Sequence, residues 1–401
     1  MISEAHAGRP ADPIPADDPY PSYRRLHEQG PVHWREDLGA FFVVSYDEAA
    51  EVLRGSGWSS DPRNSPELTA RLGGPETASG LFAKMLLFMD APEHGRLRRL
   101  VAPSFTPRGV EGLRPRVASV VDAALAALAG ADSFDVVSEL AYPVPLAVIA
   151  ELLDVGADGA ELLRVETPKL AGMLELDADP KTLADAAEGS AGLAMFLLPI
   201  LADRRRHPGG DFVSALLAAD EQGERLDLDE ALATCLLLLV AGHETTAGLV
   251  GNGLLALLNH PDQLELLRRR PHLARSAVEE LLRFDSPVQR ASRIARTDHV
   301  LGGHRIQAGR QVLVLLGAAN RDPRHFPDPD RLDITRQGAP SLAFGSGPHF
   351  CLGAALARLE AQEILVRLVD RFPGLRLDGS RPPSRRPTTA LRALRELPVL
   401  R

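Results

Sequence analysis

The sequence predicts a mainly α-helical fold with a smaller β-rich portion. Long runs with helical apolar periodicity, over residues 231–259 and 354–368, indicate helices, whereas short runs rich in β-branched and aromatic residues indicate strands. The chain has 401 residues, of which 45% are hydrophobic and 25% charged, enough to bury one large core or two domains. We find no internal repeat or low-complexity segment, and we expect a single domain over residues 1–401.

The N-terminal segment and the composition narrow the class of protein. Residues 1–20 are rich in Asp, Pro and Ala without a basic start or an apolar run, so we expect a flexible segment and neither a signal peptide nor a membrane anchor. The two cysteines argue against a disulfide framework and agree with a reducing cytoplasm. A formal net charge of −9 argues against a nucleic-acid partner.

The β-rich portion is predicted from four short runs and one turn. Gly302-Gly303 is a hairpin signal between short strands. Ser59 to Lys84 is rich in Gly, Pro and Ser, and Leu174 to Lys181 separates two helical runs, so we expect a long loop in each place. The strands are expected at Val32–Trp34, Phe41–Ser45, Val300–Leu301 and Gln311–Leu316.

The apolar run from Ala231 to Asn259 is long enough to resemble a membrane span, reaching roughly 43 Å at about 1.5 Å per residue. His243 and Glu244 lie at its middle, where a lipid-exposed helix would be strongly destabilised. A helix buried through the centre of a large soluble protein accounts for both the apolar ends and the polar middle. We therefore expect a core helix and no membrane association.

Cys351 lies directly before the helix predicted at 354–368, in the segment Phe344-Gly345-Ser346-Gly347-Pro348-His349-Phe350-Cys351-Leu352-Gly353. The free N–H groups of a helix N-terminus lower the pKa of a cysteine placed there. The glycines permit close approach and Pro348 stiffens the turn, so the segment would hold a thiolate still beside a flat ligand. Taken alone, Cys351 is more often a small core residue. A phosphate loop is disfavoured because no Lys-Ser or Lys-Thr follows, and zinc because a second Cys/His pair is missing.

The segment matches the pattern Phe-x-x-Gly-x-His/Arg-x-Cys-x-Gly, and with it the chain resembles the cytochrome P450 family of haem-thiolate monooxygenases. The motifs described next follow the order and approximate spacing of the family, so the resemblance covers most of the chain. It implies the cytochrome P450 fold, haem b as cofactor and O₂ as co-substrate. It also implies that Cys351 is the axial ligand of the haem iron and that Phe344 and Gly345 contact the cofactor.

The middle of the long helix reads Ala241-Gly242-His243-Glu244-Thr245-Thr246. The hydroxyl of Thr245 can donate back to the carbonyl of Ala241, and Gly242 leaves a groove that can hold O₂ and a water. Glu244 can relay protons into a dry pocket. A core helix with a few satisfied polar groups is the alternative. The stretch resembles the family's oxygen-activation motif, which implies catalytic roles for Glu244 and Thr245 and cofactor contacts for Ala241 and Gly242.

Glu280 and Arg283, in Glu-Leu-Leu-Arg, share one face of a helix predicted after Pro271. Most such pairs are solvated and contribute little to stability. The family resemblance implies instead a buried structural motif that pairs with a later arginine. Our candidate for that arginine is Arg331, and the motif would hold the loop of Cys351.

Cationic and hydrogen-bonding groups are expected where the two haem propionates would lie. His94 and Arg98, at i and i+4 on one helical face, match the propionate-binding His-x-x-x-Arg pair of the family. His349 and Arg293 match two further propionate contacts. For each of these residues, a solvated surface position is the alternative.

Apolar residues near these motifs are candidates for a substrate pocket, and they favour a mostly apolar substrate with few polar anchors. Taken one by one, most are more often core than pocket. His243 occupies the variable position of the oxygen-activation motif, where we expect packing or substrate contact rather than iron ligation. In the family, the two expected loops cover the substrate entrance. The candidates are Phe82, Met85, Leu86, Leu87, Leu170, Met173, Leu237, Val240, Val288, Ala291 and Leu391.

The resemblance implies a soluble, bacterial-type, cytoplasmic monooxygenase that hydroxylates a hydrophobic small molecule, with natural-product biosynthesis as the leading context. We expect a monomer. Because no flavin or nicotinamide domain is present, a ferredoxin and a ferredoxin reductase are implied as electron donors. Arg96, Arg99, Arg108 and Arg358 could form a basic landing patch, although scattered surface arginines are equally compatible. Oxidative coupling, desaturation or a non-enzymatic haem sensor or carrier are the alternatives, and the last is disfavoured because it needs no proton relay.

Overall fold

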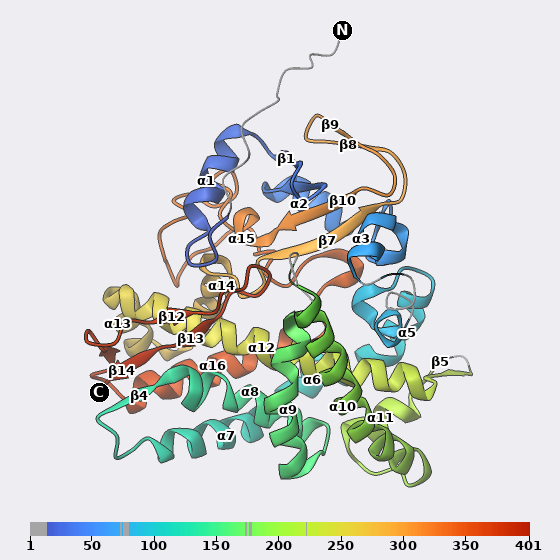
Figure 1. The fold of residues 1–401 in the computed structure, drawn as a ribbon. Coiled ribbons are helices and arrows are strands. Elements are labelled where there is room, and N and C mark those ends of the chain that lie inside the picture. The colour runs from blue at the N-terminus through green and yellow to red at the C-terminus, as the bar shows by residue number, and fades with distance from the viewer. Residues whose placement is uncertain (1–13, 73, 75–79, 173–174, 176–178, 222) are drawn as a thin grey trace.

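The fold is mainly helical with a smaller β-rich portion, as predicted. In Figure 1 the β-rich portion lies at the top, and the helical portion lies below it with α12 (Leu228–Asn259) running through its middle. The computed structural model describes residues 14–401 except residues 73, 75–79, 173–174, 176–178 and 222.

The helices alternate with short connections along most of the chain, and the helix expected at 354–368 is confirmed as the last of them. The remaining helices are α1 (Tyr20–Gln29), α2 (Tyr46–Arg54), α3 (Pro66–Arg71), α5 (Glu93–Val101), α6 (Pro107–Glu111), α7 (Arg114–Ala127), α8 (Pro143–Leu152), α9 (Gly156–Ala171), α10 (Pro180–Arg206), α11 (Phe212–Ala218), α13 (Pro261–Arg269), α14 (Ala274–Phe284), α15 (Leu316–Ala319) and α16 (Ala354–Arg371).

One five-stranded sheet carries most of the β structure, in the order β1-β2-β10-β7-β3, with a parallel pairing between β2 and β10 and antiparallel pairings elsewhere. The predicted hairpin is confirmed: Gly302 and Gly303 adopt φ of 55° and 82° between β8 and β9. The strands are β1 (Val32–Arg35), β2 (Ala40–Val43), β3 (Trp58–Ser59), β4 (Ser133–Asp135), β5 (Asp220–Glu221), β6 (Glu224–Arg225), β7 (Arg290–Ala295), β8 (His299–Leu301), β9 (His304–Ile306), β10 (Gln311–Leu315), β11 (Arg376–Leu377), β12 (Ser384–Arg385), β13 (Leu394–Glu396) and β14 (Pro398–Leu400).

The central helix begins earlier than predicted, because Asp227 and Glu230 form a reciprocal capping box at its start. Of its most apolar window, 72% is buried, so the apolar length of α12 serves the protein core. The helix α10 is also long and apolar enough to cross a membrane by composition alone, with 28% of the corresponding window buried.

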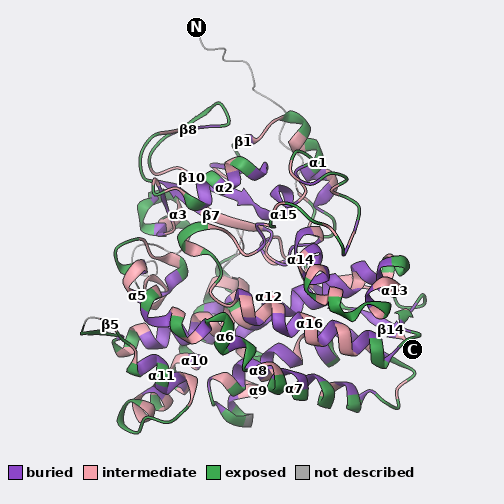
Figure 2. Ribbon diagram, turned by 180° about the vertical axis from the view of Figure 1, so that it is seen from behind, coloured by how far each residue is buried: buried purple, intermediate pink, exposed green. Residues whose placement is uncertain are grey.

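Two hydrophobic clusters meet at the middle of α12. One joins its C-terminal half, from Leu249 onward, to α7, α14 and α16. The other joins its N-terminal half, up to Leu239, to α8, α9 and α10. Figure 2 shows the long buried stretches of α12 and α16 inside the molecule. The segment 241–246, which holds four polar residues from His243 to Thr246, therefore lies where the two cores separate, and this placement allows it to border a site.

The loop predictions are only partly correct. Ser59 to Lys84 is not one continuous loop, because it contains α3, where Ser65 caps the helix by accepting a hydrogen bond from Leu68 N–H. In the predicted 174–181 loop, α10 begins at Pro180, and much of the remainder lies outside the described residues. The N-terminal segment is tied down at its end, since Ala16 and Asp17 accept hydrogen bonds from Arg392.

Candidate functional site

The loop before α16 presents Cys351 in a fixed geometry. The Cys351 N–H donates to the Phe344 carbonyl at 2.9 Å, and the Gly345 N–H donates to the Leu342 carbonyl at 2.8 Å. Gly347 has φ of 72°, and a Cβ there would lie 2.6 Å from the Leu53 carbonyl oxygen. A side chain at 347 is therefore excluded both by backbone conformation and by the approach of α2.

In the protein alone, burial opposes the acidity expected of Cys351. Solvent reaches the thiol from one side, yet the surrounding protein desolvates it and raises the pKa of Cys351. The N–H of Gly353 and the charges of Arg358 and Arg98 act in the opposite direction but do not outweigh burial. A metal ion bound at this position would deprotonate the coordinating thiol.

The predicted cationic residues come together beside this loop. The rings of His94 and His349 lie 4.1 Å apart between centroids, and Arg98 donates to the Phe350 carbonyl at 2.6 Å. Burial and then the charges of Arg293, His94 and Arg98 lower the pKa of His349 to about 3. Burial also lowers the pKa of Arg293 to about 10, with Asp90 opposing it. Because positive groups disfavour one another here, the cluster is suited to binding an anion.

One further observation supports the binding of haem propionates by this cluster. Among the residues that the structure describes, Nε2 of His94 is buried without a hydrogen-bond partner, and buried polar atoms normally have one. A cavity of about 420 Å³ lies beside it, lined by His94, Arg98, Arg99 and Gly347 among others. A haem could use all of these groups. Its propionates could bind the unpartnered His94 nitrogen and the guanidinium groups, and the nearby thiol could bind the iron.

The ionic motif that supports the loop is buried, but its third arginine is not the one predicted. Glu280 and Arg283 have side chains 2% and 3% exposed and are joined by two hydrogen bonds of 2.7 and 2.8 Å. Arg336, not Arg331, completes the group, because its Nε donates to Glu280 at 3.1 Å. Arg331 is exposed and contributes only its carbonyl oxygen, which accepts from Arg283 and Arg336.

In the middle of α12, Thr245 adopts the predicted back-bond. Its hydroxyl donates to the Ala241 carbonyl at 2.7 Å, and Thr246 does the same to Gly242 at 2.9 Å. Ala241 is exposed and Thr245 partly accessible, whereas Thr246 is buried. A Cβ on Gly242 would meet Ile149 at 3.7 Å, so the space left by this glycine faces α8.

Glu244 lies on a different side of α12 from its neighbour Thr245. Its buried carboxylate accepts from Arg386 at 2.9 Å and from the Tyr142 hydroxyl at 3.3 Å. The Arg386 side chain is 30% exposed, so it connects this carboxylate to solvent. His243 packs against the Tyr142 ring and its Nε2 lies 3.3 Å from the Thr167 hydroxyl, which makes it a packing residue.

The candidate pocket residues divide into two groups. Met85, Leu86 and Leu170 pack in a hydrophobic cluster and are 3%, 7% and 2% exposed. Met173 lies outside the described residues. The candidates that keep accessible surface are Phe82, Leu87, Leu237, Val240, Val288, Ala291 and Leu391.

The expected basic patch is largely neutralised. Arg96 pairs with Glu230, Arg99 with Glu221, and Arg358 with Glu279. Arg108 is exposed and has no ion-pair partner among the described residues. Three of the four arginines therefore present little net positive charge.

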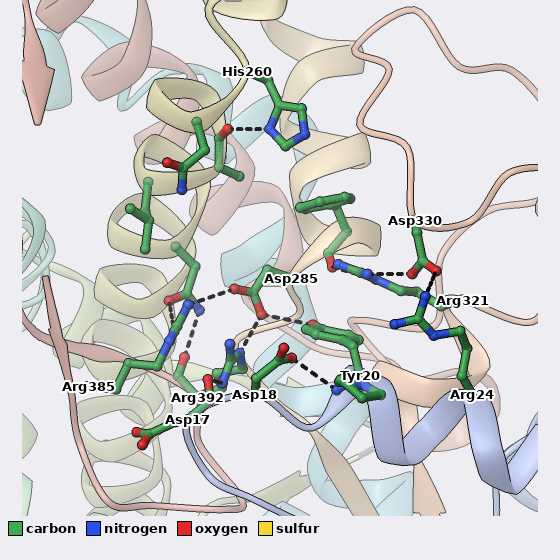
Figure 3. A pocket seen from close by; sticks show the side chains of 16 residues that line it. Asp17, Asp18, Tyr20, Arg24, His260, Asp285, Arg321, Asp330, Arg385 and Arg392 are labelled. Atoms are coloured by element: carbon green, nitrogen blue, oxygen red, sulfur yellow. Dashed lines mark hydrogen bonds and ion pairs between the residues drawn. The ribbon is translucent and has the colours of Figure 1, made fainter.

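A second cavity, of about 450 Å³, lies away from Cys351 between the N-terminal segment and the end of the chain. Figure 3 shows its charged lining: Asp285 accepts from Tyr20 and Arg392, and Arg321 pairs with Asp330. Because these charges are paired with each other, we interpret the cavity as a structural contact between the N-terminal segment and the later segments of the chain.

Three functional contacts were missed from the sequence. Arg336 and Arg386 are arginines without a distinctive spacing, and only the folded chain brings them to Glu280 and Glu244. Glu175, between α9 and α10, binds the turn near Thr389, more than two hundred residues away. No local pattern signals such contacts, since they depend on long-range packing.

Comparisons with known proteins identify the family of the chain. A family model described as "Cytochrome P450" matches residues 201–396. The cytochrome P450 monooxygenase PikC of Streptomyces venezuelae is 43% identical over 394 residues, covering 96% of this chain and 91% of the relative. The 6-deoxyerythronolide B hydroxylase of Saccharopolyspora erythraea is 40% identical over 368 residues, covering 90% of each chain.

Solved structures give the same result. The crystal structure of P450BioI in complex with hexadec-9Z-enoic acid ligated acyl carrier protein superposes with a TM-score of 0.89 at 37% identity, covering 96% of this chain and 98% of that one. Identity and coverage at these levels extend over nearly the whole sequence. The chain therefore belongs to the cytochrome P450 family, whose members are oxidoreductases that use haem b and O₂ for monooxygenation.

Proposed function

We propose that Cys351 is the thiolate ligand of the haem iron and that His94, Arg98, Arg293 and His349 hold the propionates. The unpartnered, buried Nε2 of His94 within a cationic cluster next to the cysteine loop carries this assignment. Phe344 and Gly345 would border the haem on the thiolate side, and Ala241 and Gly242 on the opposite side. When bound, the haem supplies the oxygen-activating chemistry.

Glu244 and Thr245 are assigned to proton handling. Arg386 keeps the Glu244 carboxylate connected to solvent, and Tyr142 orients its other oxygen. Glu244 would exchange protons with solvent on that side of α12. On the other side, the Thr245 hydroxyl donates to the Ala241 carbonyl and can accept a hydrogen bond from a water. Glu280, Arg283 and Arg336 serve stability and do not contact the substrate.

The substrate is a hydrophobic small organic molecule that the enzyme hydroxylates in natural-product biosynthesis. Two relatives, the monooxygenase PikC and the 6-deoxyerythronolide B hydroxylase, support this context. The accessible apolar residues on α12 and β7 would line the chamber. A ferredoxin and its reductase supply electrons, and the protein acts as a cytoplasmic monomer.

The absorption of the reduced, CO-bound protein tests the ligand assignment. Wild-type protein should show a thiolate spectrum, and Cys351→Ala should lose it while keeping the helical content of the fold. A Soret band typical of histidine ligation in fresh wild-type protein would contradict the proposal. Product analysis with electron donors and a library of hydrophobic natural products then identifies the substrate and separates hydroxylation from coupling or desaturation.

A further inference from the structure

The helix α16 carries a carboxyl group on its apolar side. Glu360 is 3% exposed, and its Oε2 is buried without a hydrogen-bond partner among the residues that the structure describes. Leu356 and Ile364 lie one turn before and one turn after Glu360 on the same side of the helix, and both belong to the hydrophobic cluster shared with α12 and α14. Figure 2 shows this part of α16 buried in the helical portion. Glu360 therefore lies in an apolar environment.

The charges around α16 are paired with one another and not with Glu360. The half of α12 that shares the cluster, residues 249–259, contains no ionisable side chain. The ion pairs on α16 and on the other helices packed against it are Arg358–Glu279 with α14, Glu363–Arg114 and Arg367–Asp122 with α7, Arg114–Glu111 with α6, and Arg268–Glu265 within α13. Burial is accordingly the only cause that acts on Glu360, and it raises the pKa of Glu360 well above its ordinary range.

An ionised carboxylate is strongly unfavourable at this position. A charge that lacks both a hydrogen-bond donor and a countercharge in an apolar interior takes up a proton instead. The loss of that proton would require water to reach the carboxylate. Because Leu356 and Ile364 close the cluster on both sides of Glu360, water reaches it only if α16 separates from its neighbours.

A movement of α16 would also reach the cysteine loop, since the helix begins there. The Ala354 N–H donates to the Cys351 carbonyl at 3.4 Å, and the Ala357 N–H donates to the Gly353 carbonyl at 3.0 Å. The first turn of α16 and the loop of Cys351 are thus joined by backbone hydrogen bonds.

We propose that Glu360 is protonated in the folded protein and acts as a pH-sensitive lock on α16. While Glu360 keeps its proton, α16 stays packed; when the proton is lost, α16 separates from the cluster and releases the loop of Cys351. This inference goes beyond the proposed function, because it concerns neither the substrate nor the delivery of protons during the reaction.

The direction of the pH dependence follows from the protons bound in each state. A glutamate in the unfolded chain titrates near about pH 4.3. Above that pH, the unfolded chain releases a proton that the folded protein keeps. The contribution of Glu360 to stability is therefore complete below about pH 4.3 and is lost as the pH rises towards the value at which the folded group ionises. Each pH unit in this window raises the unfolding equilibrium constant by up to about tenfold.

The infrared spectrum tests the protonation directly. The difference between wild-type holoprotein and Glu360→Gln at about pH 7 should contain the carbonyl band of one protonated carboxyl group, because ordinary carboxyl groups are ionised at that pH. Absence of this band from the difference spectrum would show that Glu360 is ionised in the folded protein and would overturn the proposal.

Urea unfolding at about pH 5.5 and about pH 7 tests the linkage. Between these values, the unfolding equilibrium constant of wild type should rise by roughly tenfold or more relative to that of Glu360→Gln, which cannot ionise. Glu360→Met also removes the ionisable group and provides the same comparison if the glutamine variant folds poorly. Glu363→Gln is the matched control, because it removes a carboxylate of α16 that is already paired with arginines, and it should keep the pH dependence of wild type. Equal pH dependence in wild type and both Glu360 variants would contradict the proposal.

The connection to the cysteine loop is measured by the transfer of haem to an excess of apomyoglobin. At about pH 9, wild type should release haem several-fold faster than Glu360→Gln, whereas the two rates should be similar at about pH 6. Equal rates at both pH values would show that Glu360 does not act on the loop. The CO spectra of the two proteins at about pH 6 should agree, so an error in the assignment of Cys351 would appear equally in both and is distinguishable from a failure of the lock.

Discussion

The two sides of the candidate site are stabilised differently. In the ionic motif that supports the Cys351 loop, Glu280 and Arg283 are almost fully buried. Their polar groups bind each other and the backbone of residues 329–331. In the middle of α12, Glu244 is equally buried, but its partner Arg386 reaches solvent and the neighbouring Thr245 is accessible. The first network holds a loop in place, and its central pair is sealed from solvent. The second can exchange protons with its surroundings, so stability and chemistry are carried by separate ionic groups.

The largest effects are expected on the Cys351 side. Arg283→Ala would leave the Glu280 carboxylate buried with only one arginine, which typically costs about 3–5 kcal/mol of unfolding free energy. Arg336→Ala should cost less, because Arg283 remains with Glu280. Arg331→Ala should change the unfolding free energy by less than about 0.5 kcal/mol, since its side chain is exposed. Urea unfolding and haem content measure all three.

The ranking of these variants by lost unfolding free energy decides which arginine belongs to the network. If Arg331→Ala were as damaging as Arg336→Ala, the network assigned to Glu280 would be wrong. Normal haem content and stability in Arg283→Ala would show that the loop of Cys351 does not depend on this pair.

The same network shows how far the sequence could predict the site. The Glu-x-x-Arg spacing locates Glu280 and Arg283 because both lie on one helical turn. The later arginine approaches through an irregular segment, in which Arg331 turns outward and its carbonyl, not its guanidinium, faces the network. Spacing along an irregular segment does not determine side-chain direction, so the choice between Arg331 and Arg336 required the fold.

On the α12 side, the effect should fall on chemistry and not on folding. Thr245→Ala should bind haem and substrate normally, since neither needs the hydroxyl, while product per electron pair falls roughly tenfold and peroxide rises. Thr246→Ala is the matched control, because Thr246 makes the same back-bond on the buried side of the helix. It should lose some stability and keep its coupling. Reduced-nicotinamide consumption, peroxide and product are measured together.

Efficient product formation by Thr245→Ala would remove Thr245 from the proton path and indicate that substrate or another group holds the water. A coupling defect of equal size in Thr246→Ala would show that distortion of α12, not the accessible hydroxyl, is responsible.

The chamber was predicted less well than the motifs, for a physical reason. Leu170 and Leu237 are both apolar residues in helical runs, yet Leu170 packs inside a core and Leu237 keeps accessible surface. Apolar periodicity identifies the buried side of a helix but does not distinguish a core from the lining of a cavity. Similarly, Glu175 has no sequence feature that points to Thr389, because a single exposed-looking carboxylate acquires its partners only when distant segments meet.

The smallest effect is expected from His243, on the buried side of α12. Burial lowers the pKa of His243, with Arg386 acting in the same direction and Glu244 and the Leu239 carbonyl opposing. The tyrosine and threonine that also face its ring, Tyr142 and Thr167, are uncharged partners. A lowered histidine pKa means that the unfolded chain binds the proton more readily, so this contribution to stability is complete above about pH 6.5 and is lost as the pH falls below it. As the pH falls from about 7.5 to about 5.5, wild type should therefore lose more unfolding free energy than His243→Gln, which cannot titrate, as urea unfolding at the two pH values measures. His272→Gln, at an exposed position, controls for the loss of an imidazole elsewhere.

Equal losses of unfolding free energy in wild type and His243→Gln would mean that the buried side of α12 also exchanges protons readily. The contrast between the two sides of the site would then not hold.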